Sequence, residues 1–156
     1  MTTKKMAIIA TKGALDMAYP PLILASTAAA LDWEVQVFFT FYGLSLLRKD
    51  ISDIRISPLA NPAMPMPMPM PVTLRMMPGM EAMATSMMKA KMKKKGVATL
   101  EELRSLCLEA EVKFIACQMT VDLFDFQKSD FIDGIEFGGA ATFLQFAGET
   151  DVSLFI

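Results

Sequence analysis

The stretch 99-TLEELRSLCLEAEVKFIAC-117 contains a helix signal followed at once by a strand signal. Thr99 precedes a run of helix-forming residues, and Glu102 lies three positions later. This spacing is that of a capping box and predicts a helix over 100–110. The residues expected to form its buried stripe are Leu100, Leu103, Leu106, Cys107 and Ala110. The apolar run 112–117 then predicts a buried strand directly after the helix.

The same alternation of strand and helix extends to both ends of the chain. Strands are expected at 6–10, 34–40, 133–137 and 151–156, and helical segments at about 19–31, 43–48 and 140–147. Pro20 and Pro21 fit the first turn of their helix, where a missing amide removes no intrahelical hydrogen bond. The repeated order predicts an α/β fold, a three-layer α/β/α arrangement around a parallel sheet of about four or five strands.

A segment of different composition interrupts this pattern at about residues 52–95. It holds seven of the nine prolines and eleven of the fifteen methionines. Proline at alternate positions from 65 to 71 excludes a helix there, so 52–78 is predicted to be an inserted extended loop. Residues 79–95 predict a Met-lined helix that ends in Lys89, Lys91, Lys93, Lys94 and Lys95. We therefore expect one domain over 1–156 with an inserted loop and helix.

The overall composition excludes several classes of function. The chain has 156 residues, 53% of them hydrophobic, and a formal net charge of −2, which gives no reason to expect a nucleic-acid partner. It has no histidine, which excludes His-ligated zinc or haem and a Ser-His or Cys-His catalytic pair. Neither a GxGxxG nor a GxxxxGK[ST] motif occurs, so nucleotide binding is unsupported. No metal or cofactor is expected.

The use of cysteine indicates the compartment. The chain has two cysteines, too few for a disulfide-built secreted scaffold, and no secretory signal is recognisable at its start. The longest Ala/Leu-rich stretch, 22–31, is too short to span a bilayer. A reducing cytoplasm is the expected location.

Cys117 is the candidate for chemistry because it ends the predicted strand 112–117. Ligands bind at the carboxyl ends of strands in open α/β sheets. Residues 119–122 predict a turn into a short helix, so Gln118, Met119 and Thr120 are candidates for presenting amides that stabilise a thiolate or a persulfide anion. A buried structural thiol is an equal alternative on position alone, because free cysteine is often buried.

A redox pair with Cys107 is not expected. Along the predicted helix Cys107 lies about 6 Å back from the connection, and Cys117 lies roughly 13 Å along the strand in another layer. A disulfide requires Cα atoms within about 7 Å. Cys107 also falls on the apolar stripe, which predicts a core residue.

Two further loops leave the expected carboxyl edge of the sheet. Lys12 and Gly13 follow the first predicted strand, and Tyr42 and Gly43 follow the second. Lys12 is a candidate for favouring an anionic sulfur, and the glycine for letting backbone amides approach it. The alternative is a solvated lysine and an ordinary turn glycine.

The Met-Pro tract has two interpretations, and the lysine run after it has two of its own. Thioethers are soft ligands and suggest Cu(I), but in an extended chain the Met side chains on one face are about 6.6 Å apart, so metal binding requires the chain to fold back. The favoured interpretation is an adaptable apolar surface for an oligomer or a partner. The run Lys89–Lys95 is either a solvated helix end or a docking site for an acidic partner or anionic lipid.

Five segments carry a resemblance to a known family: MAIIATKG (6–13), FFTFYGLSLL (38–47), MMKAKMKKKGVATLEEL (87–103), VKFIACQMTVDLF (112–124) and IEFGGAATFLQFA (135–147). In this order they resemble the DsrE/DsrF-like family, and within it the branch labelled peroxiredoxin-family or DsrE2-type proteins. The resemblance implies a small α/β protein of flavodoxin-like topology that forms homo-oligomers. It also implies that Cys117 carries sulfane sulfur as a persulfide and exchanges it with carriers such as TusA-like proteins.

Two hypotheses of function follow. The first is a sulfurtransferase or sulfur carrier that uses Cys117, and whether it turns over as an enzyme is left open. The second is a non-catalytic interaction module that docks to a protein or membrane through the Met-rich insertion and Lys89–Lys95. Peroxide reduction is not favoured, because no second thiol is placed to pair with Cys117 in the same subunit.

Overall fold

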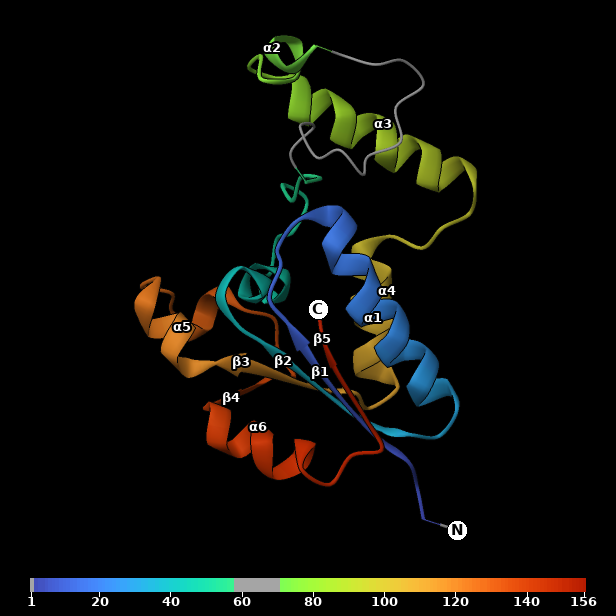
Figure 1. Ribbon diagram of the computed structural model, residues 1–156, viewed down its shortest axis with the longest axis vertical. Helices are drawn as coiled ribbons and strands as arrows, with labels where there is room; N and C mark the ends of the chain where they lie inside the picture. Colours follow the sequence, from blue (N-terminus) through green and yellow to red (C-terminus); the bar gives the residue numbers. More distant parts are fainter. Residues whose placement is uncertain (1, 58–70) are drawn as a thin grey trace.

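Five strands form the centre of the molecule in the computed structural model, which describes residues 2–57 and 71–156 (Figure 1). The strands are β1 (Lys5–Ala10), β2 (Glu34–Phe39), β3 (Lys113–Cys117), β4 (Glu136–Gly138) and β5 (Val152–Phe155). The helices are α1 (Leu15–Ala30), α2 (Val72–Arg75), α3 (Met80–Lys94), α4 (Leu100–Glu109), α5 (Gln118–Leu123) and α6 (Ala140–Ala147), with 3-10 turns η1 (Phe41–Leu47) and η2 (Lys128–Asp130).

The strands pair in parallel in the order β4-β3-β2-β1-β5. From β1 to β4 each new strand is added on the same side of the previous one, and the chain then crosses back to place β5 beyond β1. This parallel, helix-covered sheet confirms the predicted α/β fold. Its strand order differs from the 2-1-3-4-5 order of flavodoxin-like sheets, because only the last connection, through α6, returns across the sheet.

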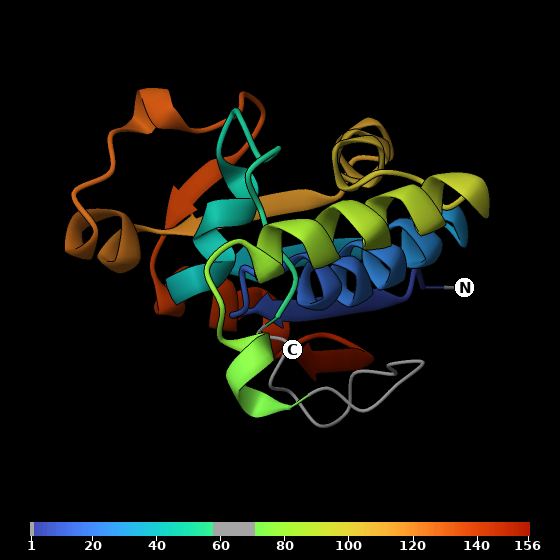
Figure 2. The ribbon, with the colours of Figure 1, turned by 90° about the horizontal axis from the view of Figure 1, so that it is seen from above.

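Helices cover the two faces of the sheet unequally (Figures 1 and 2). α1 and α4 pack against each other over one face, above a large core that includes Ile8, Val37 and Phe114. α6 covers the other face, where the described residues form a small buried cluster of Ala7, Phe38, Ile115, Cys117 and Phe143. Cys117 therefore belongs to the smaller cluster, on the α6 side of the sheet.

α1 begins at Leu15, earlier than predicted, and this changes the position of its prolines. Pro20 and Pro21 lie inside the helix, so the predicted placement in its first turn is wrong. Each proline removes one intrahelical donor. The helix forms nevertheless because its inner face is buried in the core, where Leu22 exposes 1% of its surface.

α4 has the predicted N-terminus but a different buried face. The capping box is confirmed, whereas Leu106 and Ala110 are exposed, so their predicted burial is wrong. Leu106 lies six residues after Leu100, short of the two turns that return a side chain to the same face. Arg104 is buried instead, and its guanidinium donates hydrogen bonds to the carbonyl oxygens of Leu46 (2.9 Å) and Arg48 (2.6 Å).

Replacing the cap residue is expected to destabilise the fold modestly. The Glu102 amide donates to Thr99 Oγ1 (3.2 Å), and the Thr99 amide donates to Glu102 Oε2 (2.7 Å). Thr99→Ala removes one of these bonds and should lower the free energy of unfolding by about 1 kcal/mol. Thr99→Ser should retain most of the stability. Urea unfolding of both variants tests this, and equal stability of wild type and Thr99→Ala would contradict it.

The insertion is attached to the core through one face of α3. Met80, Ala84, Met88 and Met92 pack against the core, while Met83 and Met87 are exposed. The buried Thr85 hydroxyl accepts a hydrogen bond from the Ile56 amide (3.1 Å) and donates to the Glu81 carbonyl (2.7 Å). α2 is a short helix within the predicted loop 52–78, which corrects that prediction there, and Pro71 immediately precedes it. Most of the alternating Pro tract falls on 58–70, outside the described residues.

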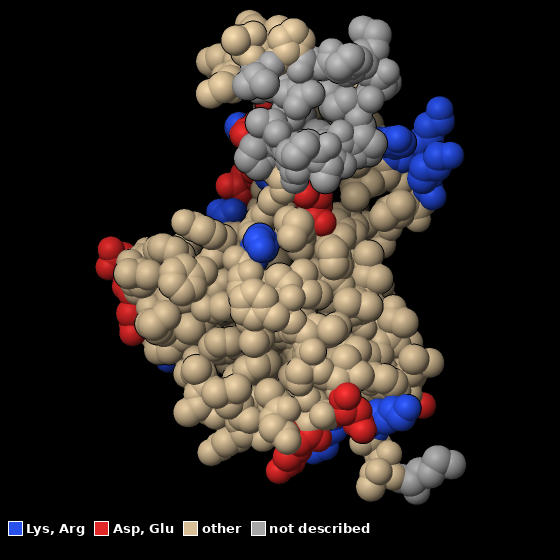
Figure 3. Space-filling view, viewed as in Figure 1, with Lys and Arg blue, Asp and Glu red and all other residues tan. Residues whose placement is uncertain are grey.

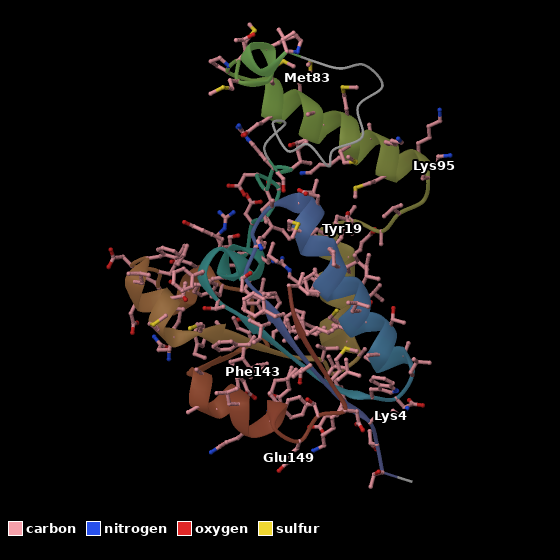
Figure 4. The ribbon with its side chains drawn as sticks, viewed as in Figure 1. Lys4, Tyr19, Met83, Lys95, Phe143 and Glu149 are labelled. Carbon is pink, nitrogen blue, oxygen red and sulfur yellow. The ribbon has the colours of Figure 1, made fainter. Side chains whose placement is uncertain are left out.

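The end of α3 is strongly basic. Lys91, Lys93, Lys94 and Lys95 are exposed. Figure 3 shows a group of basic side chains at one end of the insertion, and Figure 4 labels Lys95 there. Lys89 lies closer to the core and donates from Nζ to the Ser52 carbonyl (3.0 Å). Within residues 2–57 and 71–156 no helix has both the length and the hydropathy needed to cross a membrane.

Candidate functional site

Cys117 lies at the carboxyl edge of the sheet, as the last residue of β3 and the N-cap residue of α5. In the neighbouring strand, Phe39 pairs with Ala116, so Thr40 continues the register beside Cys117. On the other side Cys117 pairs with Gly138, the last residue of β4. The ends of three adjacent strands therefore meet around this thiol.

The thiol is almost completely buried. Cys117 exposes 5% of its surface and packs with Phe38, Ile115 and Phe143. Phe143 lies on the side of α6 that faces the sheet, and its ring stacks on that of Phe38 with centroids 5.0 Å apart (Figure 4). These apolar side chains exclude water from one side of the sulfur. Polar groups can reach the sulfur only from the side where the strands end.

Two threonine hydroxyls provide the polar side of the site. Thr120, in the first turn of α5, is fully buried, and its Oγ1 accepts a hydrogen bond from the Phe41 amide (3.1 Å). Its Oγ1 also lies 3.3 Å from Thr40 Oγ1. Thr40 is not among the positions that the sequence predicts for the site. The available signal was its place at the end of the predicted strand 34–40, but its relevance depends on β2 and β3 being neighbours.

These donors outweigh burial in setting the acidity of Cys117. Burial raises the pKa of the thiol, because a charged sulfur loses its hydration. Hydrogen bonds from the Thr120 hydroxyl and amide, the Thr40 hydroxyl and the Met119 amide lower it. The pKa of Cys117 is consequently lower than the ordinary 9.0, which favours the nucleophilic thiolate.

Cys107 has the opposite environment. Its side chain has no exposed surface, and its Sγ donates to the Leu22 carbonyl oxygen at 3.5 Å in the core. Burial raises the pKa of Cys107 to about 12. Both cysteines are free, and Cys107 occupies the predicted core position on α4.

The glycines of the two predicted loops lie where the ends of β1 and β2 approach each other. A Cβ on Gly13 would lie 2.5 Å from the Tyr42 carbonyl oxygen, and one on Gly43 would overlap the Ala10 carbonyl group. The backbone after β2 therefore lies so close to the end of β1 and the loop after it that neither glycine has room for a side chain. Lys12 is exposed and is not among the groups that shift the pKa of Cys117.

Apolar side chains are exposed on the loop after β2, on α5 and just after α5, and we call them the apolar rim. Tyr42 (70% exposed) stacks on Phe124, Phe41 contacts the same ring edge to face, and Met119 is 58% exposed. A shallow hollow is lined by Gly13, Phe41, Tyr42, Ser45, Phe124 and Phe126. The remaining predicted residue, Gln118, donates from Nε2 to Asp122 Oδ1 (2.8 Å). Among the described residues no group of three or more Cys, Asp or Glu could hold a metal ion.

Comparison with known proteins gives consistent results. The model of the DsrE/DsrF/DrsH-like family matches residues 2–155. The sulfur carrier protein DsrE2 of Allochromatium vinosum is 66% identical over 160 residues, covering 100% of both chains. The uncharacterized protein YrkE of Bacillus subtilis is 35% identical over 158 residues, covering 99% of this chain and 98% of that relative.

The fold also has a counterpart among solved structures. The crystal structure of the ychN protein from E. coli superimposes with a TM-score of 0.54, covering 99% of this chain and 100% of that one, at 13% sequence identity. That likeness concerns the fold alone. The family match over residues 2–155 and the two full-length relatives lead to one conclusion: this chain belongs to the DsrE/DsrF/DrsH-like family.

Proposed function

We propose that this protein is a sulfur carrier that holds sulfane sulfur as a persulfide on Cys117 and passes it to a partner thiol. The observation that carries the proposal is the contrast between the two thiols. Cys117 lies at the carboxyl edge of the sheet with hydroxyl and amide donors around it, whereas Cys107 is sealed in the core. The full-length relative at 66% identity, named a sulfur carrier protein, supports the same function.

The chemistry requires two thiol exchanges and no cofactor. The Cys117 thiolate attacks the outer sulfur of a donor persulfide R–S–SH, the donor S–S bond breaks, and R–S⁻ leaves and takes up a proton. Cys117 then bears the group –S–SH. A partner thiolate attacks this outer sulfur, and Cys117 leaves again as a thiolate. Sulfane sulfur moves at each step without net oxidation or reduction.

The surroundings of Cys117 suit exchange with another protein. Cys117 is 5% exposed, and the apolar rim of Phe41, Tyr42, Met119 and Phe124 exposes large apolar side chains on elements next to it. Exposed apolar groups beside a buried nucleophile are typical of contact surfaces. We propose a TusA-like or similar sulfur-relay protein as the partner, a homo-oligomer as the working form, and the cytoplasm as the location.

Intact-protein mass after incubation with polysulfide tests the proposal. Wild type is expected to gain one or more sulfur atoms, and a thiol reductant should remove them. Cys117→Ser should gain none, because serine cannot form a persulfide. Cys107→Ser is the matched control and should load like wild type. Equal loading of wild type and Cys117→Ser would refute the assignment and direct attention to the Met-rich insertion instead.

A further inference from the structure

Thr40 and Thr120 lie beside Cys117 on two different elements. Thr40 follows β2 in register beside Cys117, and Thr120 is the third residue of α5. Their Oγ1 atoms are 3.3 Å apart, within reach of a hydroxyl–hydroxyl hydrogen bond. Thr120 has no exposed surface, so its hydroxyl exchanges no hydrogen bonds with bulk water. A buried hydroxyl requires internal partners, and these are limited here.

The Phe41 amide determines what the Thr120 hydroxyl can do. Its N–H donates to Thr120 Oγ1 at 3.1 Å, and an amide cannot reverse its role. The oxygen therefore has its donor, and the hydroxyl proton remains available for Cys117 or Thr40. Phe41 supplies this amide from a φ of 49°, a conformation that a bulky side chain rarely adopts.

Among the described residues no charged side chain shifts the pKa of Cys117. The elements around Cys117 are β1 to β4, η1, α5, α6 and the loop after β1. Apart from Cys117, their titratable or charged side chains are Lys5, Lys12, Glu34, Tyr42, Lys113, Asp122 and Glu136. All but Lys5 are exposed. Lys5 lies at the opposite end of the sheet and pairs with Glu34 and Glu149, each at 3.5 Å. The groups that shift the pKa of Cys117 include none of these charges.

We propose that Thr40 and Thr120 form a hydroxyl pair that positions and stabilises the Cys117 sulfur as an anion without a charged partner. The anion is either the Cys117 thiolate or a persulfide on Cys117, and the inference about the persulfide rests on the proposed function. When the sulfur is anionic, both hydroxyl protons turn toward it, while Thr120 Oγ1 keeps the Phe41 amide as its donor. Hydroxyl protons rotate freely, so the same pair can follow the charge from the thiolate to the outer sulfur of a persulfide. Both threonines are positioning residues that act through Cys117.

The pH profile of Cys117 alkylation by iodoacetamide, read by peptide mass, tests this pair. Thr40→Val leaves the Phe41–Thr120 bond in place and removes one donor. It is expected to move the midpoint to higher pH and slow alkylation below the midpoint roughly three- to tenfold, because fewer molecules carry the thiolate. Thr120→Val should act in the same direction. Thr40→Ser and Thr120→Ser keep a hydroxyl and should restore the wild-type midpoint.

Salt provides an independent readout. Between about 0.1 M and 1 M ionic strength the screening length falls from about 10 Å to about 3 Å. The wild-type midpoint should remain constant over this range, because neutral donors set it. A midpoint that shifts with salt would overturn the inference, since it would reveal a charged partner.

The remaining outcomes separate this inference from the proposed function. If Thr120→Val does not fold, Thr40→Val alone decides, with its melting temperature as the check on folding. An unchanged midpoint in folded Thr40→Val overturns the hydroxyl pair, even if Cys117 takes up sulfur. Failure of sulfur loading with a shifted midpoint refutes the carrier function and leaves the pair as a device that stabilises a thiolate.

Discussion

At about pH 8, iodoacetamide is expected to modify Cys117 at least about a hundred times faster than Cys107 in the folded protein. The reactive form is the thiolate. Burial raises the pKa of Cys107 to about 12, whereas hydrogen bonds hold the pKa of Cys117 below 9.0 against the effect of burial. The fraction of thiolate at this pH then differs by about three powers of ten or more. The higher intrinsic nucleophilicity of a less acidic thiol offsets part of this difference, and the full burial of Cys107 adds to it.

The pH dependence of the two rates has a definite sign. Alkylation of Cys117 should rise with pH and level off as the solution passes its midpoint, which lies below 9.0. Alkylation of Cys107 should keep rising toward about pH 12, as long as the fold persists. Peptide mass spectrometry after timed labelling measures both rates, and labelling in denaturant is the control, where the two should converge. Similar rates in the native protein would contradict the contrast on which the sulfur-carrier proposal depends.

Local signals in the sequence were sufficient for the elements next to Cys117. The capping box at Thr99 fixes where α4 begins, because both of its hydrogen bonds lie within four residues. The apolar run after it places Cys117 at the end of a strand. Such features depend on neighbours in the chain, which the sequence displays directly.

Features that depend on distant parts of the chain could not be obtained in this way. Thr40 meets Cys117 only because β2 and β3 are adjacent in the order β4-β3-β2-β1-β5, and strand content alone leaves that order open. Arg104 is buried because two carbonyl oxygens of a distant segment accept its hydrogen bonds. Pro20 and Pro21 are tolerated inside α1 because tertiary packing outweighs their poor helix propensity.

The loop glycines show the same limit in a functional setting. Sequence position favours Gly13 and Gly43 as turn residues that admit an anion. In the structure a Cβ on Gly13 would meet the backbone of the loop after β2, and a Cβ on Gly43 would meet Ala10 at the end of β1. Their role is therefore to let the ends of β1 and β2 approach each other. Thr40 and Phe41, which contact Thr120, lie three and two residues before Gly43 in the same loop. The geometry around Cys117 is built on this close approach.

Gly43→Ala is accordingly expected to lower the free energy of unfolding by about 3 kcal/mol or more. The new Cβ would lie 2.7 Å from the Ala10 carbonyl carbon and closer still to its oxygen. That carbonyl cannot turn away without losing the hydrogen bond it accepts from the Thr40 amide (3.1 Å), and Ala10 is buried in an interior strand. The overlap can therefore be relieved only if the loop after β2 moves away from the end of β1. For a domain whose total stability is about 5–15 kcal/mol, this loss is large.

Gly139→Ala is the matched control for this substitution. Gly139 has an ordinary φ of −94°, and a Cβ there has no neighbour within 4 Å. It is the N-cap residue of α6, where alanine is less favourable than glycine, so Gly139→Ala should lose no more than about 1 kcal/mol. Urea unfolding compares the two variants. Because separated loops also carry Thr40 away from Cys117, any Gly43→Ala protein that remains folded should alkylate Cys117 more slowly than Gly139→Ala does. If Gly43→Ala and Gly139→Ala have the same stability and the same rate of Cys117 alkylation, the prediction is wrong. The loop after β2 would then accommodate the Cβ, and its contact with β1 would not position Thr40.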